Sequence, residues 1–201
     1  MLGAGFLTIF PVLLLSVCIV IPLNLSGVKT SNPLLYAGLF TFGTYALSEE
    51  LSKFYMFRRR LKKIEGEHTW LDLIVYSVIV GIGFGLLESI IFVVDSSPLE
   101  MLIRGICIPH GGYAALVGYC YGKSLRENKK GYAVLGVLIA VLVHGLYDFA
   151  LTGELQAVSI DLAAAIAFPM AALEIIIIIV LIVFIRKHKN DPKYTQERPE
   201  V

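Results

Sequence analysis

Long apolar segments, separated by short charged loops, constrain the fold of this chain more than any other feature. A helix that crosses a bilayer needs about 20 mostly apolar residues. Six segments of the 201-residue sequence meet this requirement: residues 4–25, 34–56, 70–94, 98–121, 132–151 and 157–185. With 57% hydrophobic and 16% charged residues, the chain does not have the composition of a water-soluble domain. The sequence therefore predicts an all-α fold, a polytopic membrane bundle of about six transmembrane helices.

The positions of lysine and arginine predict how this bundle is oriented. Basic residues gather in FRRRLKKIEGEH (residues 57–68), in GKSLRENKKG (residues 122–131) and after residue 185, whereas the alternate loops VDSSPLE and TGELQ have none. By the positive-inside rule both termini are cytoplasmic. We expect a transmembrane domain over residues 1–186, a hydrophilic cytoplasmic tail over residues 187–201, and a multi-pass location in the cell membrane. Because the basic residues lie where cytoplasmic loops are expected, nucleic acid is not an expected partner.

Nine ionisable side chains interrupt the apolar segments, and these are the candidates for a functional site. A charged side chain at the centre of a bilayer costs roughly 2.5–3.5 kcal/mol on insertion scales. Such residues are therefore expected to face one another, water or a ligand rather than lipid. They are Glu49, Glu50, Lys53, Glu88, Arg104, His110, His144, Asp148 and Glu174.

The spacing of these residues predicts which of them share a helical face. Glu49 and Lys53 are four residues apart in SEELSK, as are His144 and Asp148 in HGLYD. Residues four apart lie on the same side of a helix. Four consecutive helices would each direct at least one polar group inward. Glu174 stands on the last segment without an evident partner.

This set of residue types suits the activation of water. A carboxylate held away from bulk water gains basicity and can accept a proton near neutral pH. The imidazoles of His110 and His144 could orient the water, stabilise an oxyanion or protonate a leaving amine. Alternatively, these two histidines with Glu88 and Asp148 form a plausible zinc ligand set, in which the metal would acidify a bound water. No other cofactor is expected.

The motifs resemble those of a known family when taken in order. They are EELSK from Glu49 to Lys53, FGLLE ending at Glu88, the lone His110 after Arg104, and HGLYD from His144. This series is similar to the PrsW family of intramembrane proteases, which belongs to the CAAX-protease and bacteriocin-processing superfamily. The resemblance covers roughly residues 45–150.

The resemblance implies hydrolysis of a peptide bond in or near the membrane. The substrate would be a membrane-anchored protein or peptide, for example an anti-sigma factor. Glu49 or Glu50 would be the general base, with a small preference for Glu49 because it shares a face with Lys53. His110 and His144 would hold the water or stabilise the oxyanion. The family has been described both as metalloproteases and as glutamate-dependent enzymes without metal, so a zinc requirement stays open. The supporting residues would be Lys53, Glu88, Arg104 and Asp148.

Two other functions are compatible with these residues. Buried carboxylates and imidazoles also form the relays of proton-coupled transporters, although the chain lacks the internal repeat that many carriers show. A non-catalytic binding or immunity protein of the same fold is the other alternative. One geometric question also stays open, because a rise of about 1.5 Å per residue places Glu50 nearer the cytoplasmic end of its helix than Glu88 or Asp148.

Overall fold

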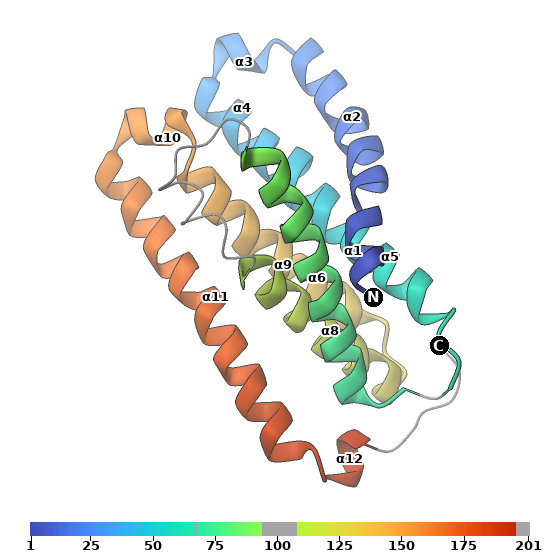
Figure 1. Cartoon of the computed structure of the whole chain (residues 1–201). Coiled ribbons are helices and arrows are strands. Elements are labelled where there is room, and N and C mark those ends of the chain that lie inside the picture. Colours follow the sequence, from blue (N-terminus) through green and yellow to red (C-terminus); the bar gives the residue numbers. More distant parts are fainter. Residues whose placement is uncertain (67, 94–107, 196–201) are drawn as a thin grey trace.

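The computed structural model describes residues 1–66, 68–93 and 108–195, and within these ranges the regular structure is entirely helical. Figure 1 shows the helices side by side in one bundle. This arrangement confirms the all-α membrane fold predicted from the sequence. In chain order the helices are α1 Leu2–Leu7, α2 Ile9–Leu25, α3 Val28–Ser31, α4 Pro33–Leu39, η1 Phe40–Leu47, α5 Ser48–Leu61, α6 Trp70–Val93, α8 Ile108–Glu127, α9 Gly131–Ala150, α10 Gly153–Val158, α11 Ile160–His188 and α12 Pro192–Thr195.

Among the described residues, four helical segments are long and apolar enough to cross a membrane. They correspond to the first, third, fifth and sixth predicted spans, and the chain is a multi-pass membrane protein. The second predicted span is helical from α4 through η1 to α5, but it contains a π-helix and three charged residues. The fourth predicted span begins outside the described residues, and the polar residues of α8 lower its hydropathy. The four segments are Leu2–Leu25, Trp70–Ile91, Gly131–Ala150 and Ile160–His188.

A π-helix, η1, replaces the ordinary α-helix that the sequence predicts between α4 and α5. The carbonyl of Thr44 in this segment accepts hydrogen bonds from the hydroxyls of Ser16, at 2.9 Å, and of Ser48. Such partners matter because a backbone polar group within a bilayer must be satisfied by the protein itself. Segments of π-helix frequently adjoin functional sites. Here η1 ends at Leu47, two residues before Glu49 and its neighbour Glu50.

Helix α8 lies in the middle of the bundle, where it contacts α6, α9, α11 and α5. Small residues allow its close approach to α6. A Cβ on Gly81 would overlap the backbone of His110, and a Cβ on Gly118 would overlap the backbone of α6. Close to these crossings, Ser77 Oγ of α6 donates a hydrogen bond of 2.6 Å to the carbonyl of Ala114. Small residues and interhelical hydrogen bonds are the usual means of packing helices within membranes, and here Gly81 lets the backbone of His110 approach α6.

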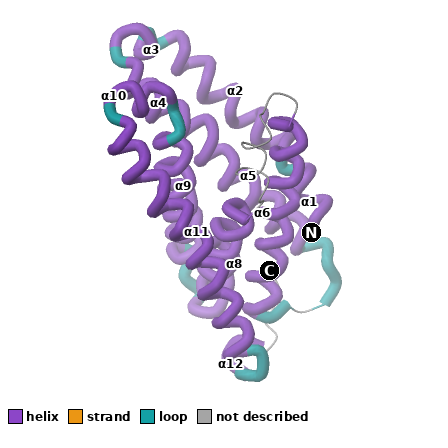
Figure 2. The backbone as a smooth tube through the Cα atoms, turned by 60° about the vertical axis from the view of Figure 1, so that its left-hand side comes forward, coloured by secondary structure: helices purple, strands orange, loops and turns teal. Residues whose placement is uncertain are grey.

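The loops of the bundle gather at two opposite ends, as Figures 1 and 2 show. Helices α3 and α10 lie at one end. Helix α12 lies at the other end, together with the C-terminal ends of α5 and α8. Basic residues lie in the last turns of α5, α8 and α11 and in the segments that follow them. One end of the bundle is therefore basic, and by the positive-inside rule it is the expected cytoplasmic end.

Candidate active site

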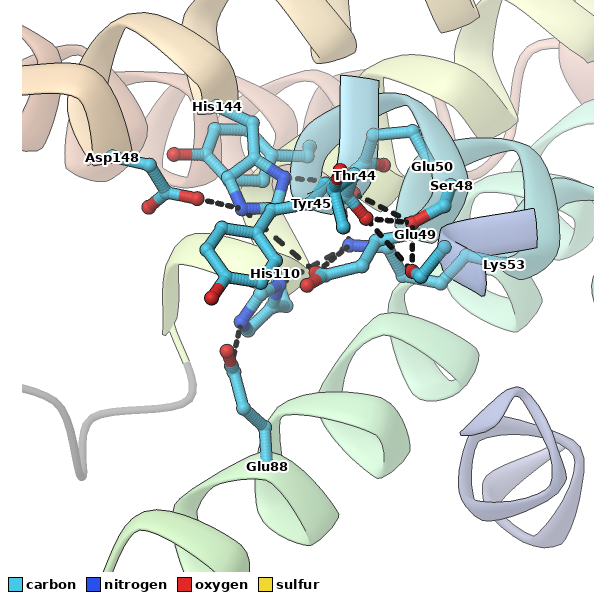
Figure 3. A network of polar contacts seen from close by, with 12 residues as sticks. Thr44, Tyr45, Ser48, Glu49, Glu50, Lys53, Glu88, His110, His144 and Asp148 are labelled. Atoms are coloured by element: carbon cyan, nitrogen blue, oxygen red, sulfur yellow. Dashed lines mark hydrogen bonds and ion pairs between the residues drawn. The ribbon is translucent and has the colours of Figure 1, made fainter. Parts of the chain in front are cut away.

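Seven of the ionisable side chains identified in the sequence meet at one place inside the bundle. They come from the first turns of α5, the second half of α6, the first turn of α8 and the second half of α9. Figure 3 shows them directed toward one another across the interior. The sequence places Glu50 nearer the cytoplasmic end of its helix than Glu88 or Asp148. In the structure these side chains nevertheless belong to the same group. We call this set the polar cluster: Glu49, Glu50, Lys53, Glu88, His110, His144 and Asp148.

Lys53 is the cation that links two parts of the cluster. Its Nζ lies 2.5 Å from Glu50 Oε1 and 3.1 Å from His110 Nδ1. An ammonium group can only donate, so Nδ1 of His110 accepts this hydrogen bond. The other ring nitrogen, Nε2, donates to Glu88 Oε2 over 2.5 Å. These two contacts determine both the tautomer and the orientation of His110.

The ring of His144 lies between carboxylates on both sides. Its Nδ1 is 3.0 Å from Glu50 Oε1 and its Nε2 is 3.2 Å from Asp148 Oδ2. Asp148 reaches this nitrogen because it is four residues further along the same helix. Nε2 also faces Glu49 Oε2 at 3.8 Å. His144 is therefore oriented by Glu50 and Asp148, with Glu49 close to the same nitrogen.

Glu49 has the least satisfied carboxylate of the cluster. The side chain is buried, and its Oε2 has no hydrogen-bond partner among the described residues. Lys53 Nζ is 4.0 Å away, beyond hydrogen-bonding distance. Three potential ligand atoms lie within 4.8 Å of one another, one each from Glu49, His110 and His144. A buried acceptor without a partner, beside two imidazoles, is the arrangement expected of a site for a cation or a reactive water.

The cluster is closed on most sides and opens along one edge. Glu49, Glu50, Lys53, His110 and His144 are all buried, whereas the side chains of Glu88 and Asp148 are 29% and 26% exposed. Both exposed carboxylates lie near the ends of their helices, on the side of the bundle away from the basic loops. Among the described residues, Glu88 and Asp148 are therefore the most exposed members of the cluster.

The potential metal-ligand atoms that lie close together in the structure are only partly those suggested by the sequence. The sequence suggests Glu88 and Asp148 as acidic ligands beside the two histidines. In the structure each of these carboxylates hydrogen-bonds one imidazole, and Glu49 is the carboxylate grouped with both. The predicted supporting residue Arg104 lies outside the described residues.

Two residues that the motifs do not contain also belong to the walls of the site. Tyr113 stacks on His144, with ring centroids 5.0 Å apart and planes at 17°. Its hydroxyl donates a hydrogen bond to Glu174 of α11. The spacing from His110 to Tyr113 is a weak signal for the tyrosine, since residues three apart share a helical face. Glu174 stood out in the sequence as a membrane carboxylate, but its partner was not apparent.

Comparisons with known proteins agree with the motifs. A family model described as PrsW family intramembrane metalloprotease matches residues 1–185. The chain is 27% identical over 146 residues to Protease PrsW of Oceanobacillus iheyensis, covering 70% of the chain and 68% of that relative. It is 30% identical over 150 residues to Protease PrsW of Halalkalibacterium halodurans, covering 72% and 65%. For Protease PrsW of Clostridioides difficile the identity is 35% over 94 residues, covering 42% and 40%.

These matches confirm the family resemblance drawn from the sequence motifs. The matched segments cover between 40% and 68% of the three relatives' own lengths. No solved structure matches the chain significantly.

Proposed function

The chain belongs to the PrsW family of intramembrane metalloproteases, and we propose that it hydrolyses a peptide bond in or near the membrane-spanning part of a membrane-anchored protein. The polar cluster is the proposed active site. An anti-sigma factor is the proposed substrate type, on the strength of the family resemblance.

One arrangement carries this proposal. Considering only the described ranges of the chain, Glu49 has a buried oxygen without a hydrogen-bond partner, and this residue lies close to two imidazoles that other carboxylates orient. A structural ion-pair network would be expected to satisfy every buried member. An unsatisfied acceptor beside histidines is instead suited to a water molecule or a metal ion that takes part in a reaction.

The residues present fit a divalent metal such as zinc. Two imidazoles and one carboxylate are a common protein ligand set for catalytic zinc, and Glu49, His110 and His144 would supply it. Ligating histidines usually bond a carboxylate through their second nitrogen, and Glu88 and Glu50 are placed to do this. Lys53 and Glu88 already bond the two nitrogens of His110, and Glu50 and Asp148 contact those of His144. One contact at each histidine must therefore open for a metal to bind. When bound, the metal would polarise the scissile carbonyl and acidify water.

Four side chains of the cluster have distinct roles in the proposed hydrolysis. In the glutamate-dependent version, Oε2 of Glu49 accepts the proton of the attacking water. His144, held by Glu50 and Asp148, is placed to stabilise the oxyanion and to return a proton to the leaving amine. In the metal-dependent version the same oxygen of Glu49 is a ligand instead. Both versions depend on Glu49, and metal content separates them.

The direct test uses purified full-length chain in proteoliposomes with a single-span reporter substrate. We expect Glu49→Gln and His144→Ala to abolish cleavage. The matched control is Glu154→Gln, which neutralises an exposed carboxylate on α10 and should leave cleavage unchanged. Cleavage that survives in both cluster variants would contradict the proposal. Metal analysis of the same samples then distinguishes the versions, because only the metal-dependent one predicts bound metal that Glu49→Gln loses.

A further inference from the structure

Helix α11 is held to the bundle by an unusual contact. Among its 29 residues only Ala163 and Glu174 are buried, while large apolar side chains such as Ile175 and Ile179 are more than half exposed. The composition of the helix and its exposure are those of a lipid-facing span. A carboxyl group in such a span is expensive unless it is paired or functional, so the position of Glu174 requires an explanation.

The partner of Glu174 is a tyrosine in the wall of the proposed active site. The hydroxyl of Tyr113 on α8 donates a hydrogen bond to Glu174 Oε1. Helix α11 can come this close because the residue before the tyrosine is Gly112, where a Cβ would lie only 3.2 Å from the carbonyl oxygen of Glu174. Both side chains are almost fully buried, at 1% and 2% exposure. Their contact therefore joins the outermost span to the centre of the site.

Tyr113 in turn contacts the groups proposed to react. Its ring stacks on His144 with a centroid separation of 5.0 Å, and the edge-to-face contact with His110 is 6.3 Å. The Nζ of Lys53 lies over the same ring at 5.9 Å. The two imidazoles are 5.5 Å apart at 80°. The ring of Tyr113 thus packs face to face against the imidazole of His144 and lies close to the ammonium group of Lys53.

We infer that Tyr113 and Glu174 are positioning residues, which hold the ring plane of His144 in line with Glu49 and do not themselves contact the substrate. This inference rests on the proposed function and extends it to α11, a helix that no motif includes. The hydrogen bond from the Tyr113 hydroxyl prevents its ring from rotating or withdrawing, and the ring keeps His144 from tilting away from Glu50. Displacements on the order of 1 Å in an active site can reduce turnover about 100-fold.

The test compares variants of the two residues with a matched control in the full chain and the single-span reporter substrate. Tyr113→Phe keeps the stacked ring and loses only the hydroxyl, so kcat should fall about 10-fold with KM unchanged. Tyr113→Leu also removes the stacked ring, so kcat should fall about 100-fold. Glu174→Gln retains an oxygen that accepts from the tyrosine and should preserve most activity. Glu174→Leu should behave like Tyr113→Phe and should add nothing in its background.

The control is Ser77→Ala, which removes a buried hydrogen bond from α6 to the carbonyl of Ala114. The substitution weakens the packing of α8 at the residue next to Tyr113 and leaves the contacts of His144 unchanged. The kcat of Ser77→Ala should stay within about twofold of the wild-type value. A second readout does not require activity. Carbethoxylation of His144 by diethyl pyrocarbonate, measured by mass spectrometry, should accelerate several-fold in Tyr113→Leu and should not change in the control.

The outcomes separate this inference from the proposed function. If the wild type cleaves the substrate and the variants match it in kcat and in His144 reactivity, the positioning role is overturned while the protease stands. Equal losses in Ser77→Ala and Tyr113→Phe would also overturn it, because both would then report general packing of α8. If the wild type does not cleave the substrate, the proposed function fails, and the reactivity of His144 alone decides whether Tyr113 and Glu174 orient the imidazole.

Discussion

Glu49 and Glu50 are neighbours in the sequence, yet the structure predicts opposite consequences when each is replaced by glutamine. Glu50 receives Lys53 at 2.5 Å and His144 at 3.0 Å and is 1% exposed. Glu49 is also buried but has an oxygen without a hydrogen-bond partner among the described residues. We therefore expect Glu50→Gln to destabilise the fold, and Glu49→Gln to abolish activity while the fold stays stable.

The magnitude follows from the contacts of each carboxylate. Removing the charge of Glu50 leaves the ammonium of Lys53 buried, with its remaining carboxylate partner, Glu49, at 4.0 Å. Breaking a buried ion pair by removing one partner costs roughly 3–5 kcal/mol. For a chain of this size, each kcal/mol lowers the melting temperature by roughly 2–4 °C, so the expected loss is on the order of 10 °C. Oε2 of Glu49 has no hydrogen bond to lose among the described residues. Glu49→Gln should therefore lower the melting temperature by no more than about 4 °C.

The assay is thermal unfolding in detergent micelles, followed by the fluorescence of Trp70, the single tryptophan of the chain, which is buried in the core. The sharper comparison is Glu50→Gln alone against Glu50→Gln combined with Lys53→Met. Removing both partners eliminates the orphaned charge, so the double variant should be more stable than the single variant. The reasoning fails if Glu50→Gln melts at the same temperature as Glu49→Gln, or if the added Lys53→Met lowers the temperature further.

Three further predictions address metal, packing and the π-helix. Wild-type protein purified without chelators should contain close to one equivalent of zinc by mass spectrometry in the metal-dependent version, and Glu49→Gln should contain far less than Glu154→Gln. Gly81→Val should reduce both melting temperature and cleavage, because its side chain would overlap the backbone that carries His110; Gly3→Val, where a Cβ meets nothing within 4 Å, should leave both nearly unchanged. Ser16→Ala should lower stability by about 1 kcal/mol through the loss of its hydrogen bond to the π-helix, measured by the same Trp fluorescence.

Much of the fold could be predicted because a bilayer restricts the chain to a few solutions. Apolar length alone identified the four segments that the structure describes as long membrane helices. The convergence of polar residues also follows from cost, since an isolated carboxylate or ammonium in a membrane helix has nowhere else to find a partner. Pairs such as Glu49 with Lys53, and His144 with Asp148, were visible because four-residue spacing places them on one face.

The features of the fold and site that the sequence did not predict depend on contacts between helices. The spacing of residues within one helix does not reveal such contacts. The π-helix over Phe40–Leu47 accepts a hydrogen bond from Ser16 on another helix, a contact that no local pattern predicts. The grouping of Glu49, rather than Glu88, with both imidazoles depends on how α5, α6, α8 and α9 are rotated relative to one another. The partner of Glu174 is 61 residues away in the sequence. In each case the decisive contact joins two helices whose relative rotation the sequence does not specify.

The charge balance of the polar cluster argues that it is built to hold a further positive charge. The cluster contains four carboxylates, one ammonium group and two imidazoles. Even with both imidazoles protonated, the cluster has three positive charges against four negative ones. A net charge buried in a membrane protein is costly, and a proton taken from water or a metal ion would offset it. Within the part of the chain that the structure describes, Oε2 of Glu49 is buried without a hydrogen-bond partner. This oxygen is therefore placed to receive either the proton of the attacking water or the metal ion, and both versions of the proposed hydrolysis depend on it. Metal binding at this oxygen would displace any proton held there, so the two versions exclude each other at Glu49 and metal content is the measurement that separates them.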